Sequence, residues 1–239
     1  MSIAENITRV EEQIAAACHR ADRPRESVHL MAVSKTHPSD AIIEAYAAGV
    51  RLFGENRVQE YASKRAALQS EDFFAQHSPA AIHCIGHLQS NKAAQAAQLF
   101  DSVDSVDSLR LADRLNKAAA EANKRLPIFI EIKLSPEESK HGLTPDAVEL
   151  DALLEKLPDL THLELRGLMT IPPYADDLEQ VHPYFRQLRL LRDSLAQRHP
   201  RLTFNGLSMG MSHDFSVAIE EGATLVRVGT AIFGARPAG

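Results

Sequence analysis

Short apolar runs alternate with longer amphipathic segments along nearly the whole chain. In residues 2–21 the apolar positions recur every three or four residues, which predicts an amphipathic helix ending at Asp22-Arg23-Pro24. Eight apolar, β-rich runs then predict strands at residues 28–34, 50–53, 81–86, 102–106, 128–134, 163–171, 202–209 and 224–229. Predicted helices lie between or after them, at about residues 39–49, 56–69, 90–99, 107–124, 144–157, 176–198 and 213–222.

This alternation indicates a parallel sheet, because parallel neighbours need a crossover connection that is usually a helix. Eight such units in about 210 residues fit a (β/α)8 barrel, with a doubly wound open sheet as the alternative. No internal repeat or Ser/Gly-rich linker marks a boundary, so we expect residues 1–239 to form a single domain, with residues 1–24 as an extra N-terminal helix packed on the barrel. In a barrel, functional residues lie at the carboxyl ends of the strands.

Composition narrows the class of protein. The 26 Lys+Arg and 32 Asp+Glu residues give a formal net charge of −6, which argues against nucleic-acid binding. Only two cysteines are present, Cys18 and Cys84, so a disulfide framework is excluded and a reducing compartment fits. With no signal peptide or long apolar stretch, the sequence predicts a cytoplasmic protein without a membrane segment.

A lysine follows the first predicted strand. Lys35 comes directly after the apolar run at residues 28–33, at the predicted mouth of the barrel. Desolvation of an amine favours its neutral form, which is the form that Schiff-base chemistry requires. The alternative is a lysine that merely extends into solvent from a strand end.

Small and hydroxyl-bearing residues follow the last two predicted strands. They are Ser208 and Ser212 after the seventh, and Gly229 and Thr230 after the eighth. Barrels commonly bind phosphate at this place, through loop amides, hydroxyls and a helix N-terminus. Ser212 has a simpler alternative role as the N-cap of the helix expected from residue 213.

Three other motifs do not carry their usual chemistry. Gly206 to Gly210 matches G-x-S-x-G, but the chain after it has no acid followed by a histidine at usable spacing. Residues 86–92 resemble a phosphate loop but lack its second glycine and the magnesium-binding hydroxyl. His83 and His87 have no accompanying carboxylate cluster in the sequence, so we predict no metal site.

Several longer strings together carry a resemblance. They are AVSKTHP (32–38), FGENRVQE (53–60), HCIGHLQSNK (83–92), SKHGL (139–143), RGLMTI (166–171), LSMGMSHDF (207–215) and VRVGTAIFGAR (226–236). In order and spacing they resemble the pyridoxal 5′-phosphate (PLP) homeostasis protein family. The resemblance implies a barrel like the N-terminal domain of alanine racemase, PLP as cofactor, and a role in carrying and buffering PLP for apo PLP-dependent enzymes.

The resemblance also implies residue roles. Lys35 would form the internal aldimine with PLP, and Ser208, Ser212, Gly229 and Thr230 would hold the phosphate. Arg227 would face the pyridine nitrogen, and Asn56 would line the cofactor's edge. His83, Ile85 and Met169 would form the pocket wall, and Lys140 corresponds to a lysine linked to secondary cofactor contact. His37 and the tail at residues 236–239 depart from relatives that have lysines there.

Arg227 favours a carrier over an enzyme. A guanidinium can only donate hydrogen bonds, so it favours an unprotonated pyridine nitrogen and weakens the cofactor as an electron sink. The chain ends at Gly239, soon after the last predicted strand, so we expect no second domain to supply a racemase's second base or to hold a dimer together. The sequence thus predicts a monomeric PLP carrier. The alternative is a monomeric amino-acid racemase of low activity, with His37, His87 or Lys133 as second base.

Overall fold

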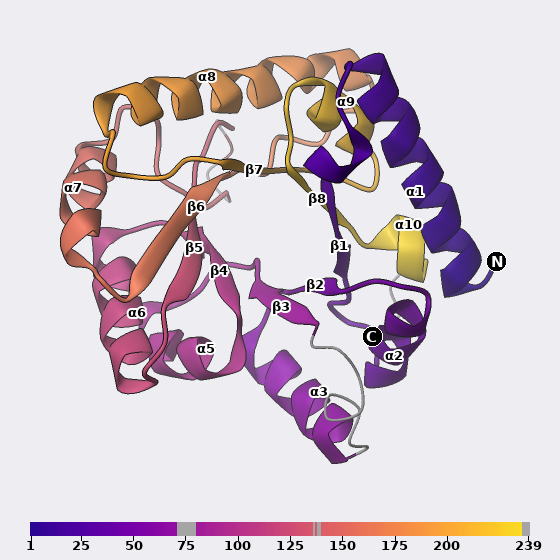
Figure 1. The fold of residues 1–239 in the computed structure, drawn as a ribbon, viewed down its shortest axis with the longest axis horizontal. Coiled ribbons are helices and arrows are strands. Elements are labelled where there is room, and N and C mark those ends of the chain that lie inside the picture. The colour runs from indigo at the N-terminus through magenta and orange to yellow at the C-terminus, as the bar shows by residue number, and fades with distance from the viewer. Residues whose placement is uncertain (71–79, 136, 138–139, 236–239) are drawn as a thin grey trace.

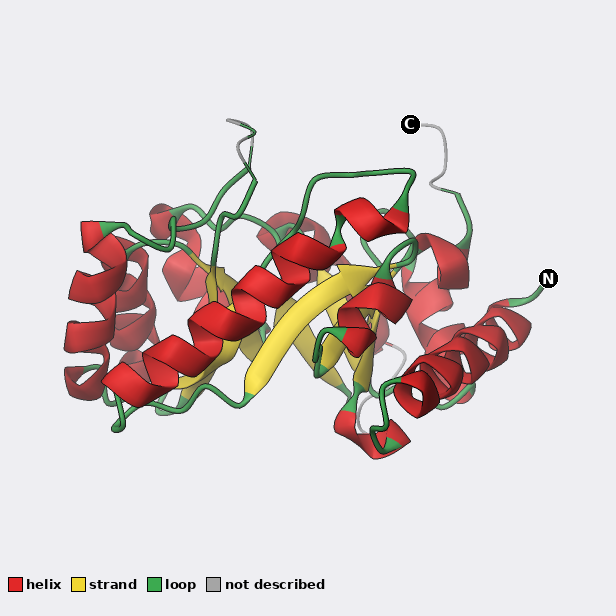
Figure 2. Cartoon of the chain, turned by 90° about the horizontal axis from the view of Figure 1, so that it is seen from above, coloured by secondary structure: helices red, strands yellow, loops and turns green. Residues whose placement is uncertain are grey.

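Eight parallel strands close into a barrel in the computed structural model, which describes residues 1–70, 80–135, 137 and 140–235 (Figures 1 and 2). The strands are β1 (His29–Val33), β2 (Leu52–Glu55), β3 (Ala81–Cys84), β4 (Ser102–Val106), β5 (Leu126–Glu131), β6 (Leu163–Met169), β7 (Gly206–Met211) and β8 (Leu225–Val228). Each pairs with the next along the chain, and β8 pairs with β1, where Met31 is in register with Arg227. The predicted barrel is confirmed, and the open-sheet alternative is wrong.

Helices cover the outside of the barrel (Figure 2). They are α1 (Ile3–Arg20), α2 (Ser39–Ala47), α3 (Val58–Ser70), α5 (Ala93–Leu99), α6 (Leu109–Glu121), α7 (Val148–Lys156), α8 (His182–Arg198), α9 (Phe215–Glu220) and α10 (Thr230–Phe233). Each predicted helix is present with shifted ends. The short helix α10 lies where the sequence predicts only a tail, because four residues are too few to show a helical period.

Side-chain alternation along the strands produces two apolar cores. The larger one fills the space between strands and helices. The smaller one lies inside the barrel and contains Met31, Val33, Ile85, Phe129, Met169 and Leu225. A packed interior of this kind makes the barrel a rigid support for the loops at its mouth.

Strand β7 differs from its prediction. It covers Gly206–Met211 instead of residues 202–209. Gly210 and Met211, which we expected to follow the strand, are therefore part of it. Gly210 has a φ of 93°, and the pairing of β7 with β8 shifts register between Ser208 and Met211. This bulge lets the strand continue for two more residues, which an apolar pattern cannot reveal.

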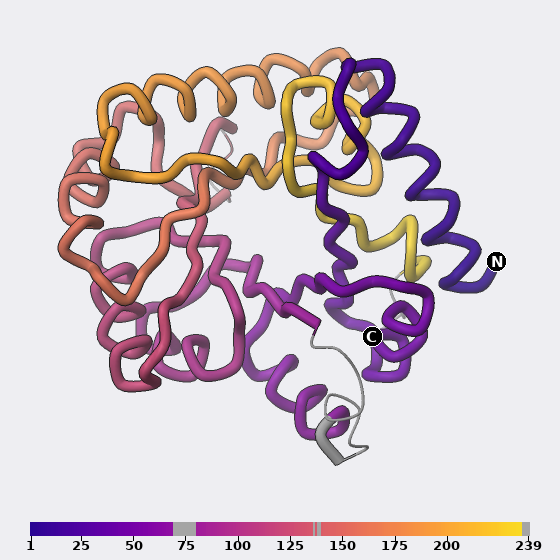
Figure 3. Tube along the Cα trace, viewed as in Figure 1, coloured from indigo at the N-terminus to yellow at the C-terminus, as the bar shows by residue number. Residues whose placement is uncertain are grey.

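Helix α1 packs against the outside of the barrel, next to α2, α9 and α10 (Figures 1 and 3). Ser2 and Glu5 form a capping box at its start. Its own residues Ile7, Val10 and Ile14 are buried on the side that faces the barrel. The Asn6 side-chain amide donates to the Ile232 carbonyl at 2.9 Å, which ties α1 to α10. No helix in the described part of the chain is both long and apolar enough to cross a membrane. The tail at residues 236–239 lies outside the described residues.

Candidate functional site

Lys35 lies in the turn after β1, at the barrel mouth. Met31 and Val33 face the barrel interior, whereas the Ser34 hydroxyl donates to Glu55 Oε1 at 2.7 Å. Lys35 follows these residues in the turn and is half-buried. Thr36, the next residue, has a φ of 66°, which is strained for a β-branched residue. Such strain is often found where a turn must fix a functional side chain.

A buried ion pair behind the turn holds it in place. Lys64 Nζ donates to the Ser34 carbonyl at 2.9 Å, to Glu55 Oε1 at 2.8 Å and to Glu60 Oε1 at 2.7 Å. The Thr36 amide donates to the same Glu60 oxygen at 2.6 Å. Burial raises the pKa of Glu55, and Lys64 opposes that shift. The sequence does not predict this pair, which engages the buried Glu55 carboxylate next to the Lys35 turn.

The loop after β8 lies against the end of β1. A Cβ atom at Gly229 would lie 3.3 Å from the Val33 carbonyl oxygen. The backbone amides of Gly229 and Ala231 both donate to Ser212 Oγ at 3.2 Å. Ser212 is therefore not the N-cap of the following helix α9, whose N-cap is Asp214. Both amides are therefore paired with Ser212 Oγ, whose own hydroxyl proton can donate to a phosphate oxygen, as can the hydroxyl of exposed Thr230. Ser212 and the loop that it holds, residues 229–231, form a cradle that meets the end of β1 two residues before Lys35.

Arg227 is a buried cation inside the barrel. Its side chain lies almost wholly out of solvent and donates to Ser208 Oγ and to the Thr170 carbonyl, both at 2.8 Å. Burial lowers the pKa of Arg227, and the carboxylates of Asp104, Asp214 and Glu131 oppose the shift. Because Ser208 contacts this guanidinium, the structure places it deeper in the barrel than Ser212. Its role toward a phosphate stays a prediction.

The structure brings Ile85 and Met169 into the interior core of the barrel, and places Asn56 at its rim. Asn56 follows β2 and is half-buried. A Cβ atom at Gly86 would lie 2.4 Å from the Asn56 carbonyl oxygen, so only glycine allows this approach.

His83 lies lower in the barrel. Its Nδ1 is 2.9 Å from Asp104 Oδ2, and Ser102 donates to the other oxygen of Asp104 at 2.6 Å. Burial opposes the charged form of His83, but Asp104 raises its pKa above the ordinary value. His83 also lines a cavity with residues that begin strands, among them His29 and Leu52. Its place in a pocket wall at the mouth stays a prediction.

The sequence does not predict two acidic side chains at the mouth, Glu131 and Asp107. Burial raises the pKa of Glu131 to about 7, and the charge of Asp107 adds to this shift. One Glu131 oxygen, Oε2, is buried and has no hydrogen-bond partner among the residues that the structure describes. Asp107 lies 3.0 Å from His87 Nδ1, so each of the histidines His83 and His87 has a carboxylate partner that spacing in the sequence does not reveal.

The mouth thus combines a lysine on a fixed turn with the cradle at Ser212 and residues 229–231, and a buried guanidinium lies deeper in the barrel. An amine can bond covalently to a carbonyl group, and the cradle can hold an anion. Lys140, implied as a secondary contact, donates to the Pro172 carbonyl at 3.0 Å.

Comparisons with known proteins agree over nearly the full chain. A model of the alanine racemase N-terminal domain family matches residues 6–237. The pyridoxal phosphate homeostasis protein of Aquifex aeolicus is 44% identical, over 99% of both chains. The protein of the same name from Escherichia coli is 42% identical, over 98% of this chain and 97% of its own.

Solved structures give the same result. PipY from Synechococcus elongatus, solved with PLP bound, superposes with a TM-score of 0.84 at 41% identity, and covers 98% of this chain and 100% of PipY. An alanine racemase from Clostridium difficile shares only the fold, with a TM-score of 0.66 and 14% identity, over 99% of this chain and 57% of its own. The chain belongs to the pyridoxal phosphate homeostasis protein family, within the wider family of alanine racemase N-terminal domains.

Proposed function

We propose that this protein binds PLP through a Schiff base to Lys35, and that it carries and buffers the cofactor for PLP homeostasis. The observation that carries the proposal is that Lys35 lies on a turn fixed by Lys64, two residues beyond the point where the loop held by Ser212 meets the end of β1. The relative PipY, 41% identical, was solved with PLP bound, which supports the same ligand here.

The contacts proposed for the remaining residues are those that the family resemblance implies. The cradle, with Thr230 and Ser208, takes the phosphate, and Arg227 faces the pyridine nitrogen. Asn56 lines the edge of the ring. The wall of the pocket is formed by His83, Ile85 and Met169. All these residues belong to one chain, so one chain is sufficient for the proposed site. We propose that the protein acts as a monomer and in the cytoplasm.

Arg227 keeps the site suited to holding the cofactor. Bound PLP supplies an electrophilic carbonyl group and a pyridine ring that can accept electrons when its nitrogen is protonated. The Arg227 guanidinium is fixed by Ser208 and Thr170, and it can only donate hydrogen bonds. It therefore offers no proton acceptor to the pyridine nitrogen and favours its unprotonated form. This weakens electron withdrawal and favours binding over turnover.

The alternative function is a racemase of low activity. One observation favours it: His87 Nδ1 donates a hydrogen bond to Asp107, which orients the His87 ring at the mouth, as a general base would require. The carrier proposal predicts that D- and L-amino acids do not exchange their α-proton in deuterated water at enzymatic rates, about 1–10³ per second. Exchange at such rates, lost in His87→Gln, would support the racemase instead.

Transfer to a recipient tests the carrier function itself. The protein is loaded with PLP, freed of unbound cofactor, and mixed with an apo PLP-dependent enzyme whose activity is then followed. We expect recovery of enzyme activity from the loaded wild type and not from Lys35→Ala treated identically. Equal recovery from both would show that the transferred cofactor does not come from Lys35.

A further inference from the structure

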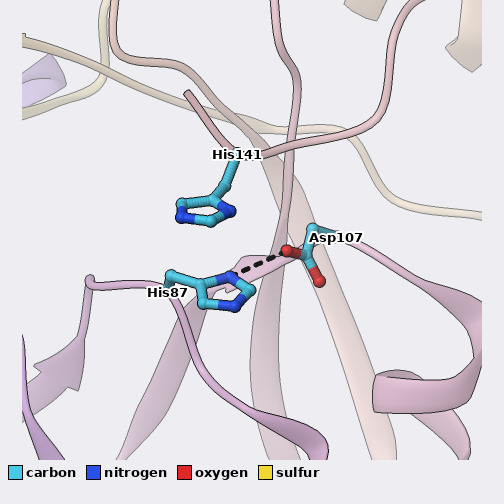
Figure 4. A group of neighbouring side chains, drawn as sticks. All are labelled: His87, Asp107 and His141. Carbon is cyan, nitrogen blue, oxygen red and sulfur yellow. Dashed lines mark hydrogen bonds and ion pairs between the residues drawn. The ribbon is translucent and has the colours of Figure 1, made fainter. Parts of the chain in front are cut away.

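Three loops at the barrel mouth bring two histidines and an aspartate together. His87 lies after β3, Asp107 follows directly on β4, and His141 lies after β5 (Figure 4). The His141 loop is fastened to its strand, since the Leu143 amide donates to the Glu131 carbonyl at 2.8 Å. The loops after three neighbouring strands thus present three potential metal ligands on one side of the barrel mouth.

The three side chains are close enough to share one ion. His87 Nδ1 lies 3.0 Å from Asp107 Oδ2, and the rings of His87 and His141 stack with centroids 3.8 Å apart. One ligand atom from each residue lies within 4.8 Å of the others. Ligands about 2.1 Å from a tetrahedral ion lie roughly 3.4 Å apart. A contraction of up to about 1.4 Å is therefore needed, and a rotation of the exposed His141 ring can provide it.

The ligand types select a class of metal. Two imidazole nitrogens and one carboxylate oxygen suit Zn²⁺, Co²⁺, Ni²⁺ or Cu²⁺, whereas Ca²⁺ and Mg²⁺ prefer oxygen ligands alone. Three protein ligands also leave a coordination position for water. His87 and Asp107 line a surface pocket with Asn91 and Arg110, so that position is accessible to solvent.

We propose that His87, Asp107 and His141 bind one divalent late transition-metal ion, which fastens the loops after β3, β4 and β5 to one another. The three ligands lie after β3, β4 and β5, whereas Lys35 follows β1 and the cradle follows β7 and β8. The proposal therefore does not depend on PLP binding, and the two can fail independently.

Cobalt titration of untagged, PLP-free protein tests this site. Co²⁺ bound through imidazole nitrogen absorbs visible light, and Zn²⁺ added afterwards should displace it. Cys18 and Cys84 are buried, and burial raises the pKa of the Cys84 thiol to about 12, so thiolates do not compete. We expect saturation at about one Co²⁺ per chain. His87→Ala and His141→Ala should each weaken binding at least about tenfold, whereas His19→Ala, which removes an exposed imidazole on α1, should not.

Heat denaturation provides the second measurement. Zn²⁺ should raise the unfolding temperature of the wild type and of His19→Ala, because a ligand that binds only the folded state stabilises it. The same addition should not raise that of His141→Ala. The proposal is wrong if Co²⁺ does not saturate, or if His87→Ala and His141→Ala bind it as tightly as the wild type does.

Discussion

Lys64 does not contact PLP in the proposed site, but it supports the turn that carries Lys35. It is 9% exposed and bonds to Glu55, to Glu60 and to the backbone of Ser34, directly before Lys35. Removing one member of a buried ion pair leaves the other charge without compensation. The Lys35 turn should therefore depend on Lys64 both for its stability and for its shape.

Replacing Lys64 tests this dependence. Lys64→Met should lower the free energy of unfolding by about 3 kcal/mol, because Glu55 stays buried without its partner. Adding Glu55→Gln should recover part of the loss. Lys156→Met is the matched control, because Lys156 pairs with Asp159 at the surface and should cost less than about 1 kcal/mol. Urea unfolding measures all four proteins, and equal losses in the two single variants would contradict the role of Lys64.

Glu131 makes a pH-dependent contribution. Its pKa is raised from 4.5 to about 7 in the folded protein, mainly by burial. Between these values the unfolded chain releases the proton while the folded protein keeps it, so folding stability falls as pH rises. The shift corresponds to a loss of up to about 3 kcal/mol between about pH 5 and about pH 8.

The variant Glu131→Gln isolates this contribution, because its amide imitates the protonated acid and does not titrate. Urea unfolding at both pH values should show that the wild type loses more stability than Glu131→Gln on going to the higher pH. Identical pH dependence in the two proteins would show that the carboxyl of Glu131 titrates normally.

At the scale of the elements, the close approach of the chain after β2 to the chain after β3 requires a glycine at position 86. Gly86 allows the β3 loop to touch the Asn56 backbone, which cannot move aside, whereas a Cβ atom at Gly54 would meet the flexible end of Met31 at 2.7 Å. Gly86→Ala should therefore cost about 2 kcal/mol of unfolding free energy, and Gly54→Ala clearly less. Urea unfolding compares them, and a larger loss in Gly54→Ala would contradict this account of the strand ends.

The elements also show how far the sequence can predict the fold. Short β-rich runs locate all eight strands, and these runs are mainly apolar because both faces of each strand are covered. Strand β4 is an exception, since it buries Ser102 and Asp104. The ends of β7 are not predicted, since its bulge at Gly210 depends on pairing with β8. The same limit applies to Ser212, whose hydroxyl accepts amides from a loop 17 and 19 residues further along the chain.

At the scale of the whole molecule, closure of the barrel assembles the candidate site. Pairing of β8 with β1 places the Gly229 loop beside Lys35, although nearly the whole chain separates them. The sequence predicts that the ends of the first and last strands meet there, because a closed barrel of eight strands pairs them. It does not predict the buried ion pair of Lys64 with Glu55, or the stacking of His141 on His87, which forms only after β3 to β5 are in place. Side-chain contacts of this kind have no signature in sequence spacing.

The central claim is that Lys35 is the covalent attachment point for PLP. The most direct test is to load the protein with PLP, reduce it with borohydride so that any Schiff base becomes permanent, and locate the modified peptide by mass spectrometry. We predict about one modification per chain at Lys35, its loss in Lys35→Arg, and its retention in the surface control Lys156→Arg. Modification of a different lysine in the wild type, or equal modification of Lys35→Arg, would contradict the account.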